Sequence, residues 1–419
     1  MAHAPDADPS RAPEHETVLK RATPELTAIT GSRFIIGFAL FGVHIVFFSR
    51  LAGIDPPFYE QLFAIGRAGV SYFFALSGFL LAVAYGRKLA LLEPGRVLRF
   101  YGARAASLWP VHLVGMAIML PLYLDDIARS PLRTLAGIGS IATLTHAYLP
   151  LHLGDQLLTL SFNTPSWSLS ALVGFYLAMP AIMFLLIRVF ALGTRGLLAV
   201  AIGGWLLTET MAIAFRGDEV AGWAFHYFPL MRFSEFLGGA CVGLVFSGAA
   251  MRARRAGSAG APRTVGATSL ELVAVGLWIG WAVAGSYLPS TLTAGAWGMP
   301  AMLVLVWMLA LDRGAVSWLL GRRLVRHLGE TTLPFAMLHF PILVYASALG
   351  WFETYGAPAT AAITFAMALV VAELGQRIVV VPAKVAVKRR VNRAVDVYED
   401  RESTVDQRAV APSAARDAA

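Results

Sequence analysis

The chain has 419 residues, of which 57% are hydrophobic and only 14% are charged. A soluble globular protein usually has about 25% charged residues, so this composition excludes an ordinary soluble domain and indicates an integral membrane protein. The formal net charge is +8, but the basic residues fall between apolar runs and form no aromatic-interleaved patch, so we expect no nucleic-acid partner.

The N-terminal segment does not have the pattern of a secretory signal. Residues 1–30 carry acids, prolines and histidines rather than a short basic region followed by a cleavable apolar core. We expect a disordered cytoplasmic tail over residues 1–30. The single cysteine, Cys241, lies in an apolar run, so no intramolecular disulfide and no cysteine-rich metal site can form.

Ten apolar runs are long enough, or nearly long enough, to cross a bilayer. They lie at about 34–50, 68–86, 107–124, 166–190, 197–215, 226–249, 268–287, 293–311, 331–351 and 358–383. The stretch at 138–154 is short and interrupted by polar residues and proline, which favours a re-entrant or interfacial segment. The sequence therefore predicts an all-α, polytopic membrane protein with about ten transmembrane helices. We expect the transmembrane domain over 31–390 and a disordered cytoplasmic tail over 391–419.

The basic residues predict the orientation of these spans. With the N-terminus inside, the inner loops and the C-terminal segment hold twenty Lys and Arg, and the outer loops hold five. Cytoplasmic loops carry such an excess of Lys and Arg. We therefore expect both termini in the cytoplasm and a multi-pass location in the inner (plasma) membrane.

The first apolar run, in SRFIIGFALFGVHIVFFSR, contains Arg33 and His44. On a helix, these two residues would point within roughly 20° of one direction and lie about 16 Å apart along the axis. Ionisable groups at membrane depth usually face a protein interior or a wet cavity and mark a functional site. The alternative is that Arg33 reaches to the headgroups as an anchor and that His44 only hydrogen-bonds to a neighbouring helix.

The second and third runs carry further candidates. In YFFALSGF, Ser77 and Gly78 interrupt an aromatic cluster that includes Tyr72, and small residues there let a helix or an acyl chain approach closely. In RFYGARAASLWP, Arg99 and Arg104 add positive charge at the inner side. Without further context, these arginines fit ordinary topology-determining residues better than a binding site.

Two later runs carry polar residues at the membrane surface or within it. In NTPSWSLSALVGFYLAMP, Trp167, Ser168 and Ser170 cluster at the expected outer interface, where aromatic residues are normally anchors. His339 lies in the apolar run LGETTLPFAMLHFPILVY. By itself, it fits a packing histidine better than a catalytic one.

In this order, the motifs resemble the membrane acyltransferase 3 family. The resemblance rests on Arg33 with His44, YFFALSGF, ARAASLWP, PSWSLSALVGFYLAMP and LPFAMLHFPI, and it covers about residues 30–390. It implies an O-acyltransferase that moves an acyl group, usually acetyl, from acyl-coenzyme A to a hydroxyl of a sugar, glycolipid, cell-wall polymer or macrolide. It also implies that His44 is the catalytic histidine and that Arg33 is an essential partner on the donor side.

The chemistry of the residues agrees with this implication. Inner arginines can hold the phosphates of coenzyme A, with Arg33, Arg104 and Arg99 as candidates, and an imidazole at membrane depth can take a proton from an attacking hydroxyl. The candidates for the acceptor site or its cavity are Tyr72, Ser77, Trp167, Ser168, Ser170 and His339. A covalent acyl-enzyme through Ser77 or Ser168 is an alternative, but direct transfer is favoured because neither serine has a recognisable base beside it. We expect no bound metal or cofactor, with acyl-coenzyme A as a co-substrate.

Two positions depart from the family pattern. The family often has a second arginine three residues after Arg104, where this chain has Ser107. It usually has a glutamate two residues after the second serine of WSLS, where this chain has Leu172. The carboxylates at membrane depth that could replace it are, in order of preference, Glu235, Glu209 and Glu373.

Glu235 is therefore the candidate catalytic partner of His44, although its spacing from Arg232 also fits a structural ion pair. The rival function is that of a non-catalytic family member, a scaffold or translocation partner in cell-envelope glycan biogenesis, and Leu172 favours it. The expected partners are acyl-coenzyme A, a hydroxyl-bearing acceptor and the lipid bilayer. The sequence does not predict the acceptor, the acyl chain length or the oligomeric state.

Overall fold

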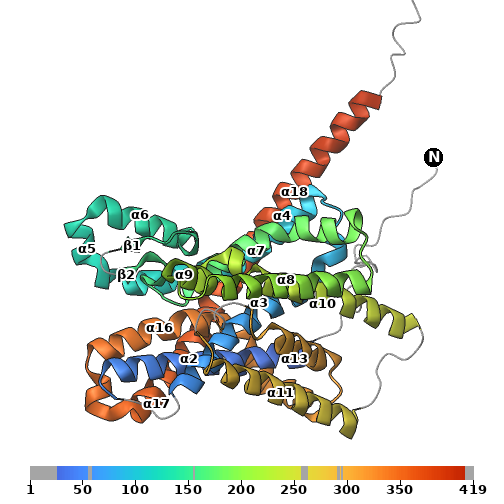
Figure 1. The fold of residues 1–419 in the computed structure, drawn as a ribbon. Coiled ribbons are helices and arrows are strands. Elements are labelled where there is room, and N and C mark those ends of the chain that lie inside the picture. The colour runs from blue at the N-terminus through green and yellow to red at the C-terminus, as the bar shows by residue number, and fades with distance from the viewer. Residues whose placement is uncertain are drawn as a thin grey trace, which may run out of the picture.

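The computed structural model describes residues 26–54, 59–153, 156–255, 263–289, 293 and 296–410. These residues are almost entirely helical, which confirms the predicted all-α class (Figure 1). The β-structure in them is one antiparallel hairpin, formed by β1 (His152–Leu153) and β2 (Gln156–Leu157). Most of the predicted N-terminal tail, residues 1–25, lies outside the described residues.

The elements follow one another in a simple order. The longer helices are α2 (Thr27–Leu51), α3 (Tyr59–Leu89), α4 (Pro94–Met119), α7 (Ser166–Phe184), α8 (Thr194–Ala214), α10 (Pro229–Arg255), α11 (Val265–Gly285), α16 (Thr332–Ala348), α17 (Trp351–Leu374) and α18 (Val381–Val410). The shorter helices are α5 (Leu124–Arg129), α6 (Pro131–Ala142), α9 (Glu219–Tyr227), α13 (Met299–Leu311), α14 (Ala315–Leu320) and α15 (Arg323–Glu330). Single 3₁₀ turns are η1 (Leu120–Tyr123), η2 (His146–Tyr148) and η3 (Leu158–Leu160), and the π-helical segments are η4 (Leu185–Val189) and η5 (Gly375–Val380).

The helices are those of a multi-pass membrane protein. Among the described residues, eight helical segments are long and apolar enough to cross a membrane. A ninth is added if α15 and α16, which are bent by 63° at their junction, form one broken span. Helix α13 has only 13 residues and is shorter than a straight crossing requires. The count of ten spans and the cytoplasmic placement of both termini therefore stay predictions.

Residues 120–165 form a small cap at one end of the bundle, where Figure 1 shows α5, α6 and the hairpin. The stretch at 138–154, predicted to be re-entrant or interfacial, consists of the end of α6, η2 and β1, and its described part contains no helix long enough to cross. The cap is tied to α7 by Ser170, whose hydroxyl donates to the carbonyl oxygen of Leu144 at 2.7 Å. The same hydroxyl accepts the backbone N–H of Ala147 at 3.2 Å.

The crossing of α3 and α10 brings two backbones into contact. A Cβ atom at Gly239 would lie 1.9 Å from the carbonyl oxygen of Ala75, and one at Gly78 would lie 2.0 Å from that of Phe236. Only glycine permits such an approach. The small residue next to Ser77 therefore admits a neighbouring helix, which was one of the two partners that the sequence suggested for it.

Helix α18 corrects the predicted boundary of the C-terminal tail. The sequence predicts disorder from residue 391, whereas α18 continues to Val410. Val395 is buried against α4, next to Gly95. Arg99 of α4 forms ion pairs with Asp396 and Glu399, both with N–O distances of 3.5 Å. The alanine-rich, charged composition is compatible with a helix, and packing on α4 supplies the burial that the segment cannot provide alone.

Candidate functional site

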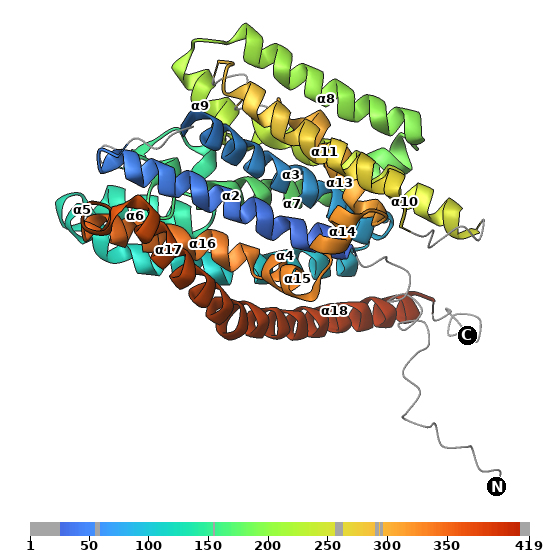
Figure 2. The ribbon, with the colours of Figure 1, turned by 90° about the horizontal axis from the view of Figure 1, so that it is seen from below.

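Two histidines from distant parts of the chain meet between α2 and α16, which lie side by side in Figure 2. The Nδ1 atom of His44 lies 2.8 Å from the Nε2 atom of His339. Their rings are stacked, with centroids 5.0 Å apart and planes inclined by 27°. His339 is buried and His44 is half-buried, so His44 is the more accessible of the two.

The hydrogen-bond partners determine which ring nitrogens carry protons in the neutral pair. The Nδ1 atom of His339 lies 2.9 Å from the carbonyl oxygen of Phe335, one turn earlier. Because a carbonyl oxygen only accepts, Nδ1 of His339 donates and its Nε2 carries the lone pair. Nδ1 of His44 must then donate to that lone pair. The second nitrogen of His44, Nε2, is left without a proton and can accept one.

Aromatic rings enclose the histidine pair. Phe335 stacks on His339 with a centroid separation of 5.5 Å, and Phe41 meets the same ring edge-on at 5.9 Å. Phe340 packs edge-on against His44 at 5.2 Å. These contacts restrict the planes of both imidazoles, so the orientation of the hydrogen bond between them is fixed by packing.

Arg33 lies near the start of α2, in a second cluster. The side chains that act on it electrostatically are Tyr176, Tyr72, Arg104 and Glu330. No hydrogen bond or ion pair joins Arg33 to another residue in the described part of the chain. The groups that act on Arg33 are thus two tyrosines, a second arginine and one acid.

Arg104, on α4, is the second cation of this cluster. Its guanidinium carbon lies 5.8 Å from the ring centre of Tyr85 and 6.0 Å from that of Tyr176. Its Nε atom is buried and has no hydrogen-bond partner among the described residues. We call Arg33, Arg104, Tyr72 and Tyr176 the cationic cluster. An unsatisfied buried donor beside a second cation is an arrangement that an anion would complete.

Tyr72 belongs to the cationic cluster rather than to the histidine pair. Its hydroxyl lies 2.6 Å from the hydroxyl of Ser32. Ser32 in turn donates to the carbonyl oxygen of Ile29 at 2.8 Å, so the proton between the two hydroxyls comes from Tyr72. The structure thus brings two predicted site residues, Arg33 and Tyr72, together, but at the opposite end of α2 from His44.

Helix α2 sets the separation between the cluster and the histidine pair. It is one helix from Thr27 to Leu51 and contains both Arg33 and His44. The eleven-residue spacing therefore places them on one face, about 16 Å apart along the axis. A ligand that contacts both must be long, with an anionic part at one end and a reactive part at the other.

Glu235, the candidate replacement for the family glutamate, is held elsewhere. Its carboxylate is fully buried and accepts from Arg232 through Nε at 3.1 Å and through Nη2 at 3.2 Å. Arg232 also donates to the hydroxyl of Ser71 at 2.7 Å. The observed polar and ring partners of His44 lie on α16, whereas those of Glu235 lie on α3 and α10. The structure therefore does not bring Glu235 to His44 and supports the structural interpretation of the Arg232–Glu235 pair.

The other two candidate carboxylates also lie near residues other than His44, and Oε1 of Glu209 is buried without a hydrogen-bond partner among the described residues. Glu209, on α8, is close enough to Glu235 and Arg232 to interact with them electrostatically. Glu373, on α17, pairs with His327 at 3.0 Å and with Arg377. In the described residues, neither one contacts His44 or His339. Leu172, at the family position, is buried in the core.

The predicted hydroxyl and aromatic candidates of α7 serve the architecture of the end of the bundle that carries the cap. Ser168 donates to the carbonyl oxygen of Pro165 at 2.8 Å, and Ser170 holds the cap as described above. The ring of Trp167 packs edge-on against Tyr227 at 5.1 Å and Phe74 at 6.0 Å. Arg99 is likewise separate from Arg33, because it is paired with α18.

The structure adds polar contacts that the sequence did not single out. His146 of the cap lies 3.2 Å from the hydroxyl of Ser166, and burial lowers the pKa of His146 to about 3. Asn163 donates to the carbonyl oxygen of Met337 at 2.7 Å, two residues before His339. The only local signal for these residues was their polarity within apolar surroundings. Their partners lie in other elements, which spacing along the chain does not reveal.

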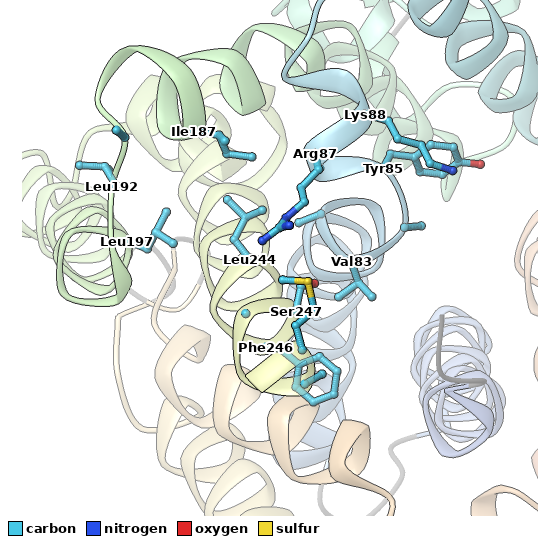
Figure 3. Close-up of a pocket in the computed structure, with 17 residues that line it drawn as sticks. Val83, Tyr85, Arg87, Lys88, Ile187, Leu192, Leu197, Leu244, Phe246 and Ser247 are labelled. Carbon is cyan, nitrogen blue, oxygen red and sulfur yellow. The ribbon is translucent and has the colours of Figure 1, made fainter. Parts of the chain in front are cut away.

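A cavity of about 430 Å³ lies between α3, η4, α8 and α10, and one of its lining residues is Tyr85, whose ring neighbours Arg104. Its walls are mostly apolar, and Figure 3 shows Arg87 reaching into it between Leu244 and Ile187. Tyr85 and Lys88 extend toward the other side of α3 in the same view. None of the predicted site residues lines this cavity.

Comparison with known proteins identifies related sequences. A family model described as "Acyltransferase domain" matches residues 26–374. The chain is 26% identical over 365 residues to the acyltransferase MdmB of Streptomyces mycarofaciens, covering 82% of this chain and 86% of that protein. It is 35% identical over 115 residues to protein 2 in the picA locus of Rhizobium radiobacter, covering 23% of this chain and 55% of that protein. No solved structure gives a significant match.

Proposed function

The chain belongs to this acyltransferase family, and we propose that it transfers an acyl group, usually acetyl, from acyl-coenzyme A to a hydroxyl of a carbohydrate, glycolipid or glycosylated natural product. The chain is a multi-pass membrane acyltransferase. We propose four properties beyond this: a coenzyme A donor, an acetyl group, a carbohydrate acceptor and a location in the inner membrane.

The observation that carries the proposal is the hydrogen bond from Nδ1 of His44 to Nε2 of His339. It leaves Nε2 of His44 free to take the proton of an acceptor hydroxyl as that oxygen attacks the thioester carbonyl. The new C–O bond forms, the C–S bond breaks, and the proton passes from His44 to the departing thiolate. An ester and free coenzyme A result, so the step needs no other reactant.

The cationic cluster supports the choice of donor. Arg33 and Arg104 present guanidinium groups without a hydrogen-bonded acid in the described residues, and guanidinium binds phosphate through parallel hydrogen bonds. Coenzyme A carries phosphates at one end and its thioester at the other, joined by a long flexible arm. The separation of about 16 Å between Arg33 and His44 along α2 suits such an elongated molecule.

The rival proposal is a non-catalytic scaffold or translocation partner in cell-envelope glycan biogenesis. It is favoured by Leu172, which stands where the family usually has a glutamate, and by the absence of a described carboxylate next to His44. The enzyme is favoured because His339 already orients His44 in a form that can accept a proton.

The test uses the purified full-length protein in detergent or nanodiscs. Acetyl- and longer acyl-coenzyme A donors are supplied with a panel of hydroxyl acceptors, and both released thiol and acylated product are measured. We expect His44→Ala to lower the transfer rate by about 10² to 10⁴, the usual contribution of general base catalysis, with the protein still folded. His152→Ala is the matched control, because His152 lies on the exposed face of β1.

The outcomes separate the two functions. Wild-type transfer that is lost in His44→Ala and kept in His152→Ala supports the acyltransferase with His44 as base. Equal turnover by a folded His44→Ala protein removes His44 from the mechanism. No thiol release with any donor and acceptor favours the scaffold.

A further inference from the structure

A third basic side chain, on the C-terminal helix, acts electrostatically on the cationic cluster. Lys384, near the start of α18, interacts electrostatically with both Arg104 and Arg33. We propose that Lys384 completes a three-cation site, with Arg33 and Arg104, for the phosphate groups of the acyl donor. This inference rests on the function proposed above and adds a binding residue that lies 280 positions after Arg104 in the chain.

The packing of α18 on α4 fixes the level at which Lys384 lies. The two helices are antiparallel, because Gly95 of α4 meets Val395 and Gly102 meets Val391 and Val387. Lys384 is one turn before Val387 and shares its face of α18. Continuing the same register places Lys384 about level with the turn of α4 that follows Arg104.

Buried valine contacts hold α18 in this register. Val395 is buried against Gly95, and Arg99 pairs beside it with Asp396 and Glu399 at N–O distances of 3.5 Å. Exposed ion pairs contribute little to stability, so the packing of the valines is what places Lys384 near the level of Arg104. The contact of Arg99 itself with the donor stays a prediction.

The balance of charge around the three cations indicates an anionic ligand. Arg33, Arg104 and Lys384 interact with one another, and Glu330 is the acid that acts on Arg33. Arg33 and Arg104 are half-buried and Lys384 is exposed. Like charges held together are unfavourable unless an anion neutralises them, and burial of two of them increases the cost. The unpartnered, buried Nε of Arg104 shows that the protein itself does not satisfy this donor in the described residues. A ligand with several phosphate charges matches this deficit better than a single carboxylate does.

The position of Ser107 explains why a cation from another helix is useful here. Ser107 follows Arg104 by one turn, and its hydroxyl donates back to the carbonyl oxygen of Ala103 at 2.9 Å. Helix α4 therefore offers no second basic group at this level. Lys384 brings a positive charge to the same level from α18.

The experiment measures donor binding and KM for the full-length enzyme with two probes, acetyl-coenzyme A and acetyl-pantetheine, which lacks the phosphates. We expect Lys384→Gln to raise Kd and KM for acetyl-coenzyme A by about tenfold, the effect of losing one charge-assisted hydrogen bond, and to leave kcat unchanged. Acetyl-pantetheine should be used equally well by both proteins. Arg389→Gln, on the exposed face of α18 opposite to Lys384 and Val387, is the control and should behave as wild type.

A variant that moves the positive charge from α18 to α4 tests the position of Lys384 beside Arg104. Ser107→Arg added to Lys384→Gln should recover most of the lost affinity for acetyl-coenzyme A, because it restores a cation at the same level. Unchanged acetyl-coenzyme A affinity in a folded Lys384→Gln protein would overturn the proposal, as would an equal loss with acetyl-pantetheine. Failure of Ser107→Arg to recover affinity would overturn the placement of Lys384 beside that turn. If the wild type neither binds nor uses acetyl-coenzyme A, the proposed function fails and this inference fails with it.

Discussion

The Nδ1 atom of His44 lies 2.8 Å from the Nε2 atom of His339, although 295 residues separate them along the chain. The hydrogen bond joins the first described helix to α16, so the histidine pair is assembled only when these helices pack together. A backbone carbonyl, that of Phe335, ends the chain of hydrogen bonds where a carboxylate would serve in many enzymes. His44 is thus oriented by groups that carry no charge in the neutral pair.

With His44 as the proposed base, we expect His339 to act as a positioning residue, so its removal should slow the transfer step. We expect His339→Ala to lower kcat by about 10- to 100-fold, as loss of an orienting partner commonly does, with donor KM near the wild-type value. His339→Gln should recover part of the loss, because its amide oxygen can accept the Nδ1 proton of His44. Steady-state kinetics of the three proteins, matched for folded fraction, check this. A wild-type kcat in His339→Ala would show that the ring only packs.

Arg33 should contribute to donor affinity rather than to the chemical step. We expect Arg33→Ala to raise donor KM by about tenfold or more and Arg33→Lys to raise it less, because lysine keeps the charge but loses the paired hydrogen bonds of guanidinium. Added salt should weaken donor binding in the wild type. Arg195→Ala, at the exposed start of α8, is the control. If KM is the same in wild type and Arg33→Ala, Arg33 is an anchor at the membrane surface.

The sequence predicted the features that depend on local composition. Long apolar runs predicted the helices, and the spacing of Arg33 and His44 predicted that they share one face, which α2 bears out. The family resemblance is confirmed by the match over residues 26–374. Apolar runs and the spacing of polar residues are properties of a single helix, so they can be recognised in one sequence.

The contacts between helices could not be predicted in the same way. His339 by itself was predicted to be a packing histidine rather than a catalytic one, because nothing in LPFAMLHFPI shows that His44 of α2 faces it. Residues after 391 were also assigned to a disordered tail, since their burial depends on Gly95 and on the pairs of Arg99 with α18. These features depend on which surfaces meet, and that is decided by the whole packed bundle.

The glycine contacts between α3 and α10 should be essential for folding. Gly239→Val would place a Cβ atom 1.9 Å from the carbonyl oxygen of Ala75, so the two helices must separate. We expect the free energy of unfolding to fall by about 1–3 kcal/mol or more, the size seen for overpacked cores. Gly276→Val on α11, where an added Cβ meets open space, is the control. Thermal unfolding in detergent and size-exclusion profiles compare them, and a Gly239→Val protein as stable as the control contradicts the close approach.

Substitutions of Glu235 test whether its carboxylate has a structural or a catalytic role. If it replaced the family glutamate, Glu235→Gln would lower transfer by at least about tenfold and Leu172→Glu would restore part of it. In the structure, Glu235 is buried and hydrogen-bonded to Arg232. We therefore expect Glu235→Gln to lower the free energy of unfolding by up to about 3–5 kcal/mol, the loss seen when a buried ion pair is broken. The activity per folded molecule should be retained. Leu172→Glu should then restore nothing. The unfolding midpoints and specific activities of both variants distinguish the structural role from the catalytic one. Glu353→Gln, at an exposed position, is the control. A stable Glu235→Gln protein with lost activity would return Glu235 to the catalytic machinery.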